Sequence, residues 1–554
     1  MVVILLRARS FARALFLFLM VNVMRCLLIN PFYPLSENPS PPLGLAYLAA
    51  ALEKAGVDVE ILDYVVFPYN ETDFWYRLTQ FKPDIVAATA VTMTFDGAIQ
   101  IIRVAKRWHS GCLTVMGGPH VTFCAEETLS AYPELDIVVL GEGEATLVEI
   151  ADEAGKGGKW KEIPGLVYRL GDSLVSTGKR LHPIDVNTLN VPARHLLALG
   201  RYRALGMPIS MTTSRGCPYA CIFCVGRKMV GAKVRYRNPV NVVEEMETLA
   251  GYGFCQINIA DDLFTANAHH CLAVCDEILN RNLKVKWTSF ARVDTVSRVV
   301  LQRMKDAGCH AVSFGIESGN ADILKTIRKG ITLDQVIEAV SLCNQVGLMP
   351  HGSFILGLPG ETPETLKETL AFGEKLKKQG VSYGFHLLAP FPGTWVRQKS
   401  AELGITILSN DWSDYHANRA IVETPSVTRG MLDDIVTGWE NDFNRYLGLI
   451  AQRMAAGEAS EEEAWPLVNL ERTITLYDLM MEAAIEKKGR WTIGTPARQA
   501  GDLLQDLVDH LLTEEGDARR GKLVSALSHA IENGFLQYTV TADIIQWKWG
   551  GSHH

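Results

Sequence analysis

The chain has 554 residues, of which 48% are hydrophobic and 21% charged, and its formal net charge is −8. One hydrophobic core rarely serves more than about 250–300 residues, so two to four domains are expected. The acidic balance and the lack of a dense basic run argue against nucleic acid as the main partner. Eleven cysteines without a secretory context indicate reduced thiols in a cytoplasmic protein, where cysteines commonly serve metals or catalysis.

The first 23 residues precede the region that we expect to fold. Three arginines stand before an apolar run, Ala14 to Val21, as they do in a signal peptide. No small-residue cleavage site follows, and the run is too short to span a bilayer. We therefore interpret residues 1–23 as an extension outside the fold, with a peripheral membrane anchor as the minority interpretation. Residues 550–554 resemble the remnant of an affinity tag.

Residues 24–155 alternate between short apolar runs and helical stretches. Continuous apolar strands with helical crossovers predict a parallel sheet covered on both faces. Five such units favour a doubly wound, flavodoxin-like α/β domain, in which ligands bind beyond the carboxyl ends of the strands. The expected strands are Cys26–Ile29, Val57–Leu62, Ile85–Thr89, Leu113–Met116 and Ile137–Leu140.

The residues at these carboxyl ends are polar or small. Two of the turns are rich in glycine, which lets the backbone approach a bulky ligand closely. We take this edge as a candidate ligand site, formed by Asn30, Thr89, Thr92, Gly117, Gly118, Pro119, His120, Glu142, Gly143 and Glu144.

A connector with a few edge strands is expected over residues 156–205, and a second alternation follows over 206–400. Six strand–helix units are too few for a closed eightfold barrel, so an open, partial (βα)6 barrel is predicted. Residues 401–549 form a mostly helical C-terminal domain in this interpretation. The barrel strands are expected at Ile209–Thr213, Gln256–Ala260, Val285–Ser289, Ala311–Gly315, Gly352–Leu356 and Tyr383–Leu388.

The strongest motif follows the first barrel strand, where Cys217, Cys221 and Cys224 have the spacing C-x3-C-x2-C. Three thiolates on one loop can bind three irons of a cubane cluster and leave the fourth iron open to a cofactor or substrate. A structural zinc site would need a fourth ligand and usually a second cysteine pair, which the chain does not offer. The motif therefore predicts a catalytic [4Fe–4S] cluster.

This loop resembles that of the radical S-adenosylmethionine (SAM) superfamily, with Phe223 at the aromatic position. The resemblance implies SAM-binding residues at the ends of the later strands. Asp261 and Asp262 replace the superfamily's glycine-glycine-glutamate; neighbouring side chains point opposite ways, so one should bind the methionine amino group, and we slightly favour Asp261. The other SAM-binding residues implied are Arg292, Glu317, Ser318, Ile355, Gly357 and Leu388.

A doubly wound domain ahead of a radical SAM barrel resembles the cobalamin-dependent branch of that superfamily. The stretches Gly117–His120 and Gly141–Glu144 are typical of this branch. The resemblance implies that the candidate site described above binds cobalamin. The histidine-donating D-x-H-x-x-G motif is absent, so cobalamin would bind without a histidine lower ligand, or the domain has lost it.

The resemblance implies a 5′-deoxyadenosyl radical that functionalises an unactivated carbon, most simply by C-methylation from methylcobalamin. Anaerobic tetrapyrrole cyclisation, or another rearrangement with or without cobalamin, is the alternative. A methylthiotransferase would need a second cluster, for which Cys26, Cys112 and Cys124 supply only the number. A redox or scaffold protein is the non-enzyme alternative.

A one-electron reductant such as flavodoxin or ferredoxin and a small-molecule substrate are the expected partners. Aromatic side chains between Trp412 and Tyr446 could line an apolar substrate pocket.

Overall fold

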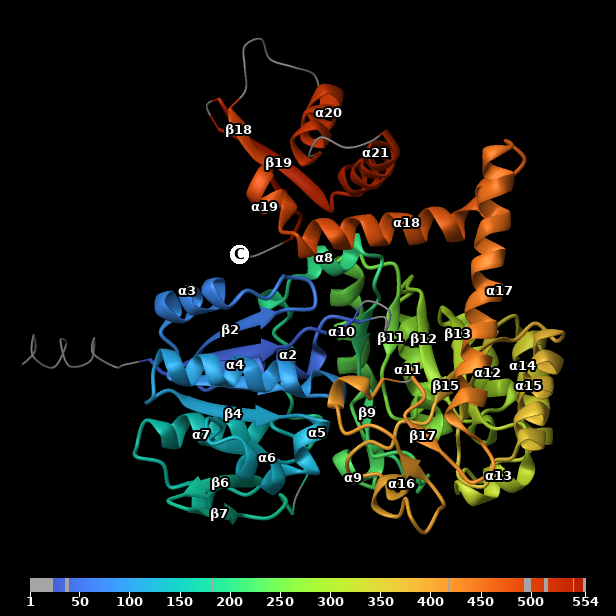
Figure 1. Cartoon of the computed structure of the whole chain (residues 1–554), viewed down its shortest axis with the longest axis horizontal. Coiled ribbons are helices and arrows are strands. Elements are labelled where there is room, and N and C mark those ends of the chain that lie inside the picture. Colours follow the sequence, from blue (N-terminus) through green and yellow to red (C-terminus); the bar gives the residue numbers. More distant parts are fainter. Residues whose placement is uncertain are drawn as a thin grey trace, which may run out of the picture.

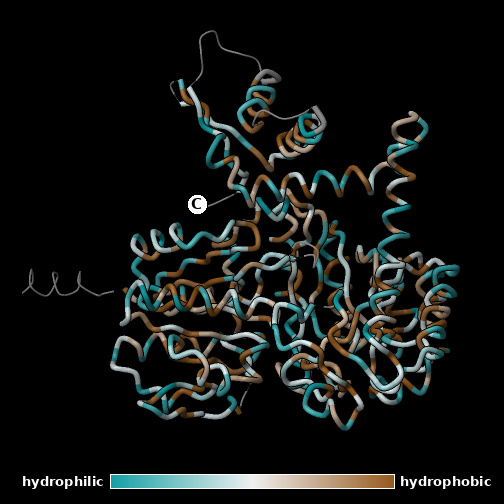
Figure 2. The backbone as a smooth tube through the Cα atoms, viewed as in Figure 1, coloured by the Kyte–Doolittle hydropathy of each residue, from teal (hydrophilic) through white to brown (hydrophobic). Residues whose placement is uncertain are grey.

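The computed structural model describes residues 23–551, except 35–38, 182, 417, 493–499, 513–516 and 542. The predicted extension, apart from Val23, and the last three residues of the predicted tag remnant lie outside the described residues. Two sheets of mainly parallel strands stand side by side, and the C-terminal helices lie across one end of both (Figure 1). Hydrophobic segments are concentrated in the strands of the two sheets (Figure 2).

The first sheet confirms the doubly wound prediction. Its parallel strands have the order β2-β1-β3-β4-β5, and two antiparallel strands from the connector extend the edge beyond β5. Alternate residues of β1 supply the two cores: Leu27 and Ile29 pack against α3 and α4, while Cys26 and Leu28 pack against α2 and α7. The strands are β1 (Arg25–Asn30), β2 (Asp58–Asp63), β3 (Ile85–Thr89), β4 (Leu113–Gly117), β5 (Ile137–Val139), β6 (Leu166–Leu170) and β7 (Ser173–Ser176), and the main helices are α2 (Leu43–Lys54), α3 (Glu71–Phe81), α4 (Phe95–Trp108), α6 (Ala125–Ala131) and α7 (Glu144–Ala154).

The second sheet is the predicted open barrel of six parallel strands, ordered β15-β14-β13-β12-β11-β8. The strands are β8 (Ile209–Met211), β11 (Ile257–Ile259), β12 (Trp287–Ala291), β13 (Cys309–Glu317), β14 (Met349–Leu356) and β15 (Ser382–Leu387). The helices that follow them in turn are α10 (Pro239–Gly251), α11 (Ala268–Asn280), α12 (Arg298–Asp306), α13 (Ala321–Thr326) with α14 (Leu333–Val346), α15 (Pro363–Lys377) and α16 (Trp395–Gln398).

The C-terminal region is helical, as expected, but it also contains a three-stranded antiparallel sheet that we did not predict. Its strands are β18 (Arg490–Thr492), β19 (Leu536–Thr541) and β20 (Ile544–Trp549), ordered β18-β20-β19. In β20 the alternate residues Ile545, Trp547 and Trp549 are buried, which is the period of a strand with one face on a core. The helices are α17 (Arg429–Ala455), α18 (Glu461–Met481), α19 (Ala484–Lys488), α20 (Ala500–Leu511) and α21 (Asp517–Glu532).

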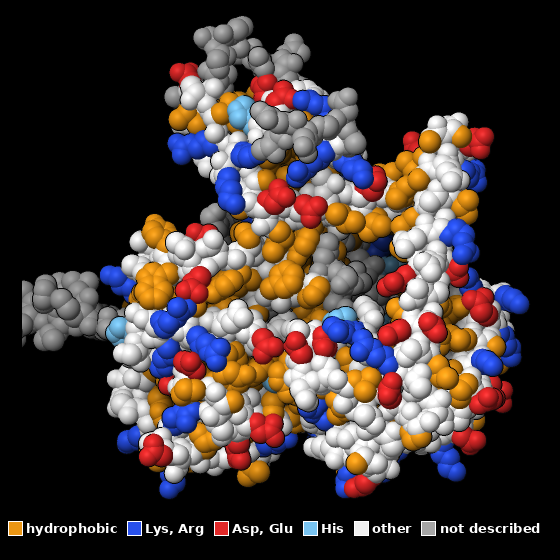
Figure 3. All heavy atoms as spheres, viewed as in Figure 1, with side chains coloured by type: hydrophobic (Ala, Val, Ile, Leu, Met, Phe, Trp, Pro, Cys, Tyr) orange, Lys and Arg blue, Asp and Glu red, His pale blue; other side chains and the backbone are white. Residues whose placement is uncertain are grey.

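The C-terminal region docks on the connector helix α8 (Leu199–Ala204), where Tyr202 joins the core of α18, α20 and α21. The helix α17 carries exposed hydrophobic side chains, which Figure 3 shows along the arm that it forms with α18. Trp439 packs on Tyr383 and Phe385 of the barrel edge but stays partly exposed, and Phe443 and Tyr446 are exposed as well. Among the described residues, no helix is long and apolar enough to cross a membrane.

Candidate active site between the two sheets

The three motif cysteines lie on one loop after β8, between the short paired strands β9 (Ser214–Arg215) and β10 (Arg235–Tyr236). Cys217 and Cys221 are half-buried and Cys224 is exposed. Burial raises the pKa of the Cys221 thiol, while the positive charges of the nearby Lys329 and Arg292 lower it by less. Each thiol interacts electrostatically with its neighbours on the loop. This arrangement suits a cubane, in which each thiolate binds a different iron; no three His, Cys, Asp or Glu side chains of the described residues converge on a single-ion site.

The two neighbouring aspartates after β11 have different surroundings. Asp261 is buried and accepts hydrogen bonds from the Thr213 backbone N–H (2.6 Å), the Thr213 hydroxyl (2.6 Å) and the Ser214 hydroxyl (2.7 Å). Asp262 is exposed; one oxygen accepts a hydrogen bond from the Gly216 N–H at 3.0 Å. Asp261, the aspartate that the sequence favours slightly as the SAM ligand, therefore ties the cluster loop to β11. Asp262 is exposed near Cys224.

Two buried cations flank the cluster loop. Arg292 donates to both oxygens of Asp294 at 2.9 Å, and its guanidinium carbon lies 3.5 Å from the centre of the Tyr219 ring on the loop. Lys329 pairs with Glu317 at 2.7 Å, and both side chains are buried. Glu317 has φ = 71°, a left-handed conformation that a non-glycine residue adopts only where the surroundings enforce it. Lys329 was not predicted, because it lies outside every motif of the sequence.

The remaining predicted SAM residues lie at the same barrel edge but in different settings. The Ser318 hydroxyl is fully buried against Thr369, where it supports the α15 helix. Gly357 has φ = 86°, and a Cβ there would lie 3.2 Å from Leu432. Leu388 is buried beside it, and Ile355 and Phe223 are half-buried against the barrel core. Gly357 and Leu388 thus pack closely against each other after the ends of β14 and β15.

A cavity of about 400 Å³ opens at the carboxyl edge of the first sheet. Its walls are mainly apolar, from Leu28, Val115 and Val139 on the strands and Leu45, Leu48 and Leu147 on α2 and α7. Seven of the ten residues predicted for this site line it: Thr89, Gly117, Gly118, Pro119, Glu142, Gly143 and Glu144. Two of the lining glycines leave little room for a side chain: a Cβ on Gly143 would lie 3.2 Å from Leu48 of the cavity wall, and one on Gly118, at φ = 104°, would lie 2.7 Å from the Ala90 carbonyl oxygen.

Asn30, Thr92 and His120, the other three predicted residues, do not line the cavity. Asn30 donates to Asp63, and Thr92 is buried. The His120 ring packs between Phe95 and Trp412, with ring centres 4.3 and 4.8 Å away, and burial lowers its pKa to about 4. Trp412 thus packs between His120 of the first domain and Tyr415, whose ring centre lies 5.0 Å away.

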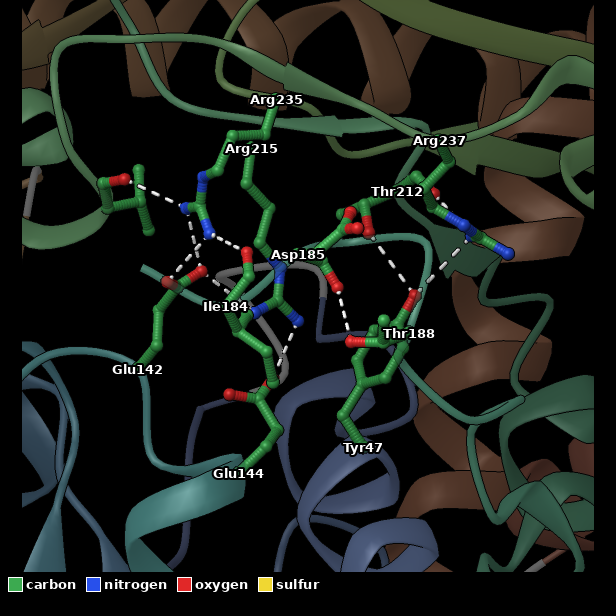
Figure 4. Close-up of polar contacts among 11 residues, drawn as sticks. Tyr47, Glu142, Glu144, Ile184, Asp185, Thr188, Thr212, Arg215, Arg235 and Arg237 are labelled. Carbon is green, nitrogen blue, oxygen red and sulfur yellow. Dashed lines mark hydrogen bonds and ion pairs between the residues drawn. The ribbon is translucent and has the colours of Figure 1, made fainter. Parts of the chain in front are cut away.

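The barrel closes one side of the cavity. Met229 and Val230, at the end of the cluster-loop helix α9 (Gly226–Val230), line it together with Arg215, which lies two residues before Cys217. Arg215 pairs with Glu142 at 3.0 Å and with Glu144 at 2.7 Å (Figure 4). The ligand edges of the two sheets therefore meet.

The cysteines considered for a second cluster do not gather at this edge. Cys26 and Cys112 are buried near the amino ends of their strands, and burial raises the pKa of Cys112 to about 12. Cys124 instead follows α5 (Pro119–Thr122) and donates to the His120 carbonyl. The structure does not support the methylthiotransferase alternative.

Comparison with known proteins agrees with this architecture. Residues 36–151 match the B12 binding domain family, and residues 211–373 match the radical SAM superfamily. An uncharacterized methyltransferase from Pyrococcus horikoshii is 36% identical over 403 residues, which cover 71% of this chain and 87% of the relative. The chain belongs to the cobalamin-dependent radical SAM enzymes.

Other members of this family differ in reaction. The anaerobic magnesium-protoporphyrin IX monomethyl ester cyclase of Cereibacter sphaeroides is 31% identical over 441 residues, covering 76% of this chain and 70% of the cyclase. The fold resembles that of the cobalamin-dependent SAM radical enzyme OxsB, solved with aqua-cobalamin and SAM, with a TM-score of 0.67 and 19% identity over 92% of this chain and 79% of OxsB. Cobalamin-dependent radical SAM enzymes use a [4Fe–4S] cluster, SAM and cobalamin.

Proposed function

We propose that this cobalamin-dependent radical SAM enzyme methylates an unactivated carbon of a small-molecule substrate. The observation that carries the proposal is the apolar cavity of the first sheet, which shares Arg215, Met229 and Val230 with the cluster-loop region. A corrinoid in this cavity and a cluster on the loop could act on one substrate. The methyltransferase relative from Pyrococcus horikoshii supports methylation as the outcome.

The proposal gives each group of residues a task. Cys217, Cys221 and Cys224 would hold the cluster, and Asp262 would accept hydrogen bonds from the methionine ammonium of SAM, a charge-assisted contact roughly twice as strong as a neutral one. When bound, the cofactors supply the 5′-deoxyadenosyl radical and the methyl group. Glu317 and Lys329 lie beside Cys221 and would orient the ribose and the carboxylate of SAM.

The experiment is anaerobic reconstitution with iron, sulfide and hydroxocobalamin, followed by reduction and SAM carrying a labelled methyl group. A methyltransferase should pass label to the corrinoid and release S-adenosylhomocysteine, in addition to 5′-deoxyadenosine. The Cys221→Ala protein should lose 5′-deoxyadenosine only, because methylation of a reduced corrinoid needs no radical. Release of 5′-deoxyadenosine with no labelled corrinoid would favour the cyclase-type alternative, which the Cereibacter sphaeroides relative supports.

We also propose that an acidic one-electron carrier, of the flavodoxin or ferredoxin kind, docks on a basic face around the outside of the cluster loop. Arg227 donates to the Pro218 carbonyl of the loop, and Lys179 donates to the Lys228 carbonyl on α9. Burial and the nearby Lys179 lower the pKa of Lys228. Arg328 and Lys399 flank Trp395 of α16, next to Ile222 of the loop. The helices α9, α16 and α13 lie along one edge of the molecule (Figure 1).

Reversing charge at this face, as in Arg227→Glu with Lys228→Glu, should slow reduction by flavodoxin and leave reduction by dithionite unchanged. Lys82→Glu, at the opposite edge of the first sheet, is the control. Equal slowing with both reductants would mean that the loop itself is damaged and that the face is no docking site. We infer a cytoplasmic location from the reduced thiols and the need for such a carrier.

A further inference from the structure

Four charged side chains join the cavity mouth to the cluster loop, and we call them the interdomain ion-pair cluster: Glu142, Glu144, Arg215 and Arg235 (Figure 4). Arg235 donates to both oxygens of Glu142 at 2.9 Å, while Arg215 reaches Glu142 at 3.0 Å and Glu144 at 2.7 Å. The four side chains expose only 7–14% of their surface, so salt screens these pairs weakly.

Glu142 is the carboxylate that the two arginines share. Arg215 and Arg235 are direct partners on the antiparallel strands β9 and β10, and like charges in that position repel each other. Glu142 bridges both guanidinium groups from the other domain. The planar guanidinium of an arginine binds a carboxylate through two N–H groups, so it fixes the direction of the contact as well as its distance, whereas a lysine ammonium does not.

The same side chains contact both functional regions. Arg215 precedes Gly216, whose N–H is held by Asp262 and whose neighbour is Cys217. Arg235 donates to the Ile184 carbonyl at 2.6 Å and to the carbonyl of Val230, a residue of the cavity wall, at 2.9 Å. Hydrogen bonds and ion pairs therefore connect Val230 of the cavity wall, through Arg235 and Glu142, to Arg215, which lies two residues before Cys217.

We infer that Arg215 and Arg235 are positioning residues that couple occupancy of the cavity to the conformation of the cluster loop. Glu142 and Glu144, which the family resemblance places among the cobalamin-binding residues, bind these arginines. The inference rests on the proposed corrinoid site. It adds that a corrinoid stabilises the cavity wall and, through the ion-pair cluster, the loop that carries the three thiols.

Hydrogen exchange of the segment 214–224 tests the coupling without a turnover assay. Exchange is measured anaerobically on the reconstituted full chain, with and without hydroxocobalamin. In the unmodified protein, hydroxocobalamin should slow exchange about fivefold or more, the lower end of typical coupling between sites. Glu142→Gln keeps the side-chain shape and removes the shared charge, so it should abolish the slowing. Glu149→Gln, which breaks the Arg180–Glu149 pair on the same helix as Glu144, is the matched control and should retain it.

The outcomes separate three cases. Slowing in Glu142→Gln equal to that in the unmodified protein overturns the inference, even if the variant melts at a lower temperature. Retained corrinoid with no slowing in the unmodified protein also overturns it. No corrinoid retained by the unmodified protein refutes the proposed cavity itself. If Glu142→Gln does not fold, Arg235→Lys, which keeps the charge and loses the fork, should weaken the slowing, and unchanged slowing there overturns the inference.

Discussion

The carboxyl edges of the two sheets face each other and are built in opposite ways. The first edge is a cavity of aliphatic walls and glycines, whose shape depends on side chains that are missing. The second edge is a loop held by buried charges, among them Asp261 and the Glu317–Lys329 pair. We learn from this difference that added volume should damage the first edge, whereas lost charge should damage the second.

The largest effect is expected at the cluster loop. Cys221→Ala removes one of three iron ligands, so bound iron and 5′-deoxyadenosine formation should both be abolished. Corrinoid retention should persist, because the cavity walls are intact. Iron analysis, product chromatography and the corrinoid absorbance of one sample test this. Full turnover by Cys221→Ala would refute the cluster assignment.

Filling the cavity should have the reverse pattern. Gly143 has φ = −99°, which any residue adopts, so Gly143→Leu adds volume against Leu48 without backbone strain. Corrinoid retention should fall below detection while iron content is unchanged. Gly118→Leu is less informative, since φ = 104° adds strain of its own. Gly448→Leu on the exposed face of α17 is the control, and corrinoid loss there too would mean that the effect is not local.

The two aspartates should separate stability from binding. Asp261→Ala leaves buried donors of Thr213 and Ser214 without an acceptor, so we expect a loss of about 3 kcal/mol in the free energy of unfolding. Asp262→Ala should cost little stability and weaken SAM binding strongly. Denaturant unfolding and isothermal titration of both variants decide the matter. Stronger loss of SAM binding in a stably folded Asp261→Ala protein would restore our first assignment.

The most gradual effect concerns pH. Burial raises the pKa of Glu361, in the turn after β14, to about 8, although hydrogen bonds from the N–H groups of Gly357 and Leu358 lower it. The folded state therefore holds a proton that the unfolded chain loses near pH 4.5. Its stabilising contribution is complete below that pH and is lost as the pH rises toward 8, by at most about 1.4 kcal/mol per pH unit. Glu361→Gln should flatten the melting temperature between pH 5 and 8, and parallel curves for variant and parent would contradict this.

The two edges also differ in how far the sequence predicted them. Strand periodicity and glycine-rich turns were enough to predict both sheets and seven residues of the cavity, because strands and turns depend on residues that are close in the sequence. The partners of charged groups were not predicted: Asp261 and Asp262 are adjacent in sequence, and only their long-range neighbours distinguish them. Lys329 and Arg235 lie outside any motif, since ion pairs depend on which loops meet in space. The strands β18–β20 were missed because polar residues mask the period of β19.

The central claim is that the corrinoid cavity and the cluster loop form one site across the two sheets. The most direct measurement is electron paramagnetic resonance of the full chain loaded with cob(II)alamin, before and after the cluster is reduced. We predict that the cob(II)alamin signal acquires a dipolar interaction only when the reduced cluster is present, and that Cys221→Ala removes that interaction while keeping the corrinoid. A corrinoid signal that is retained by the chain but is indifferent to the reduced cluster would contradict the account.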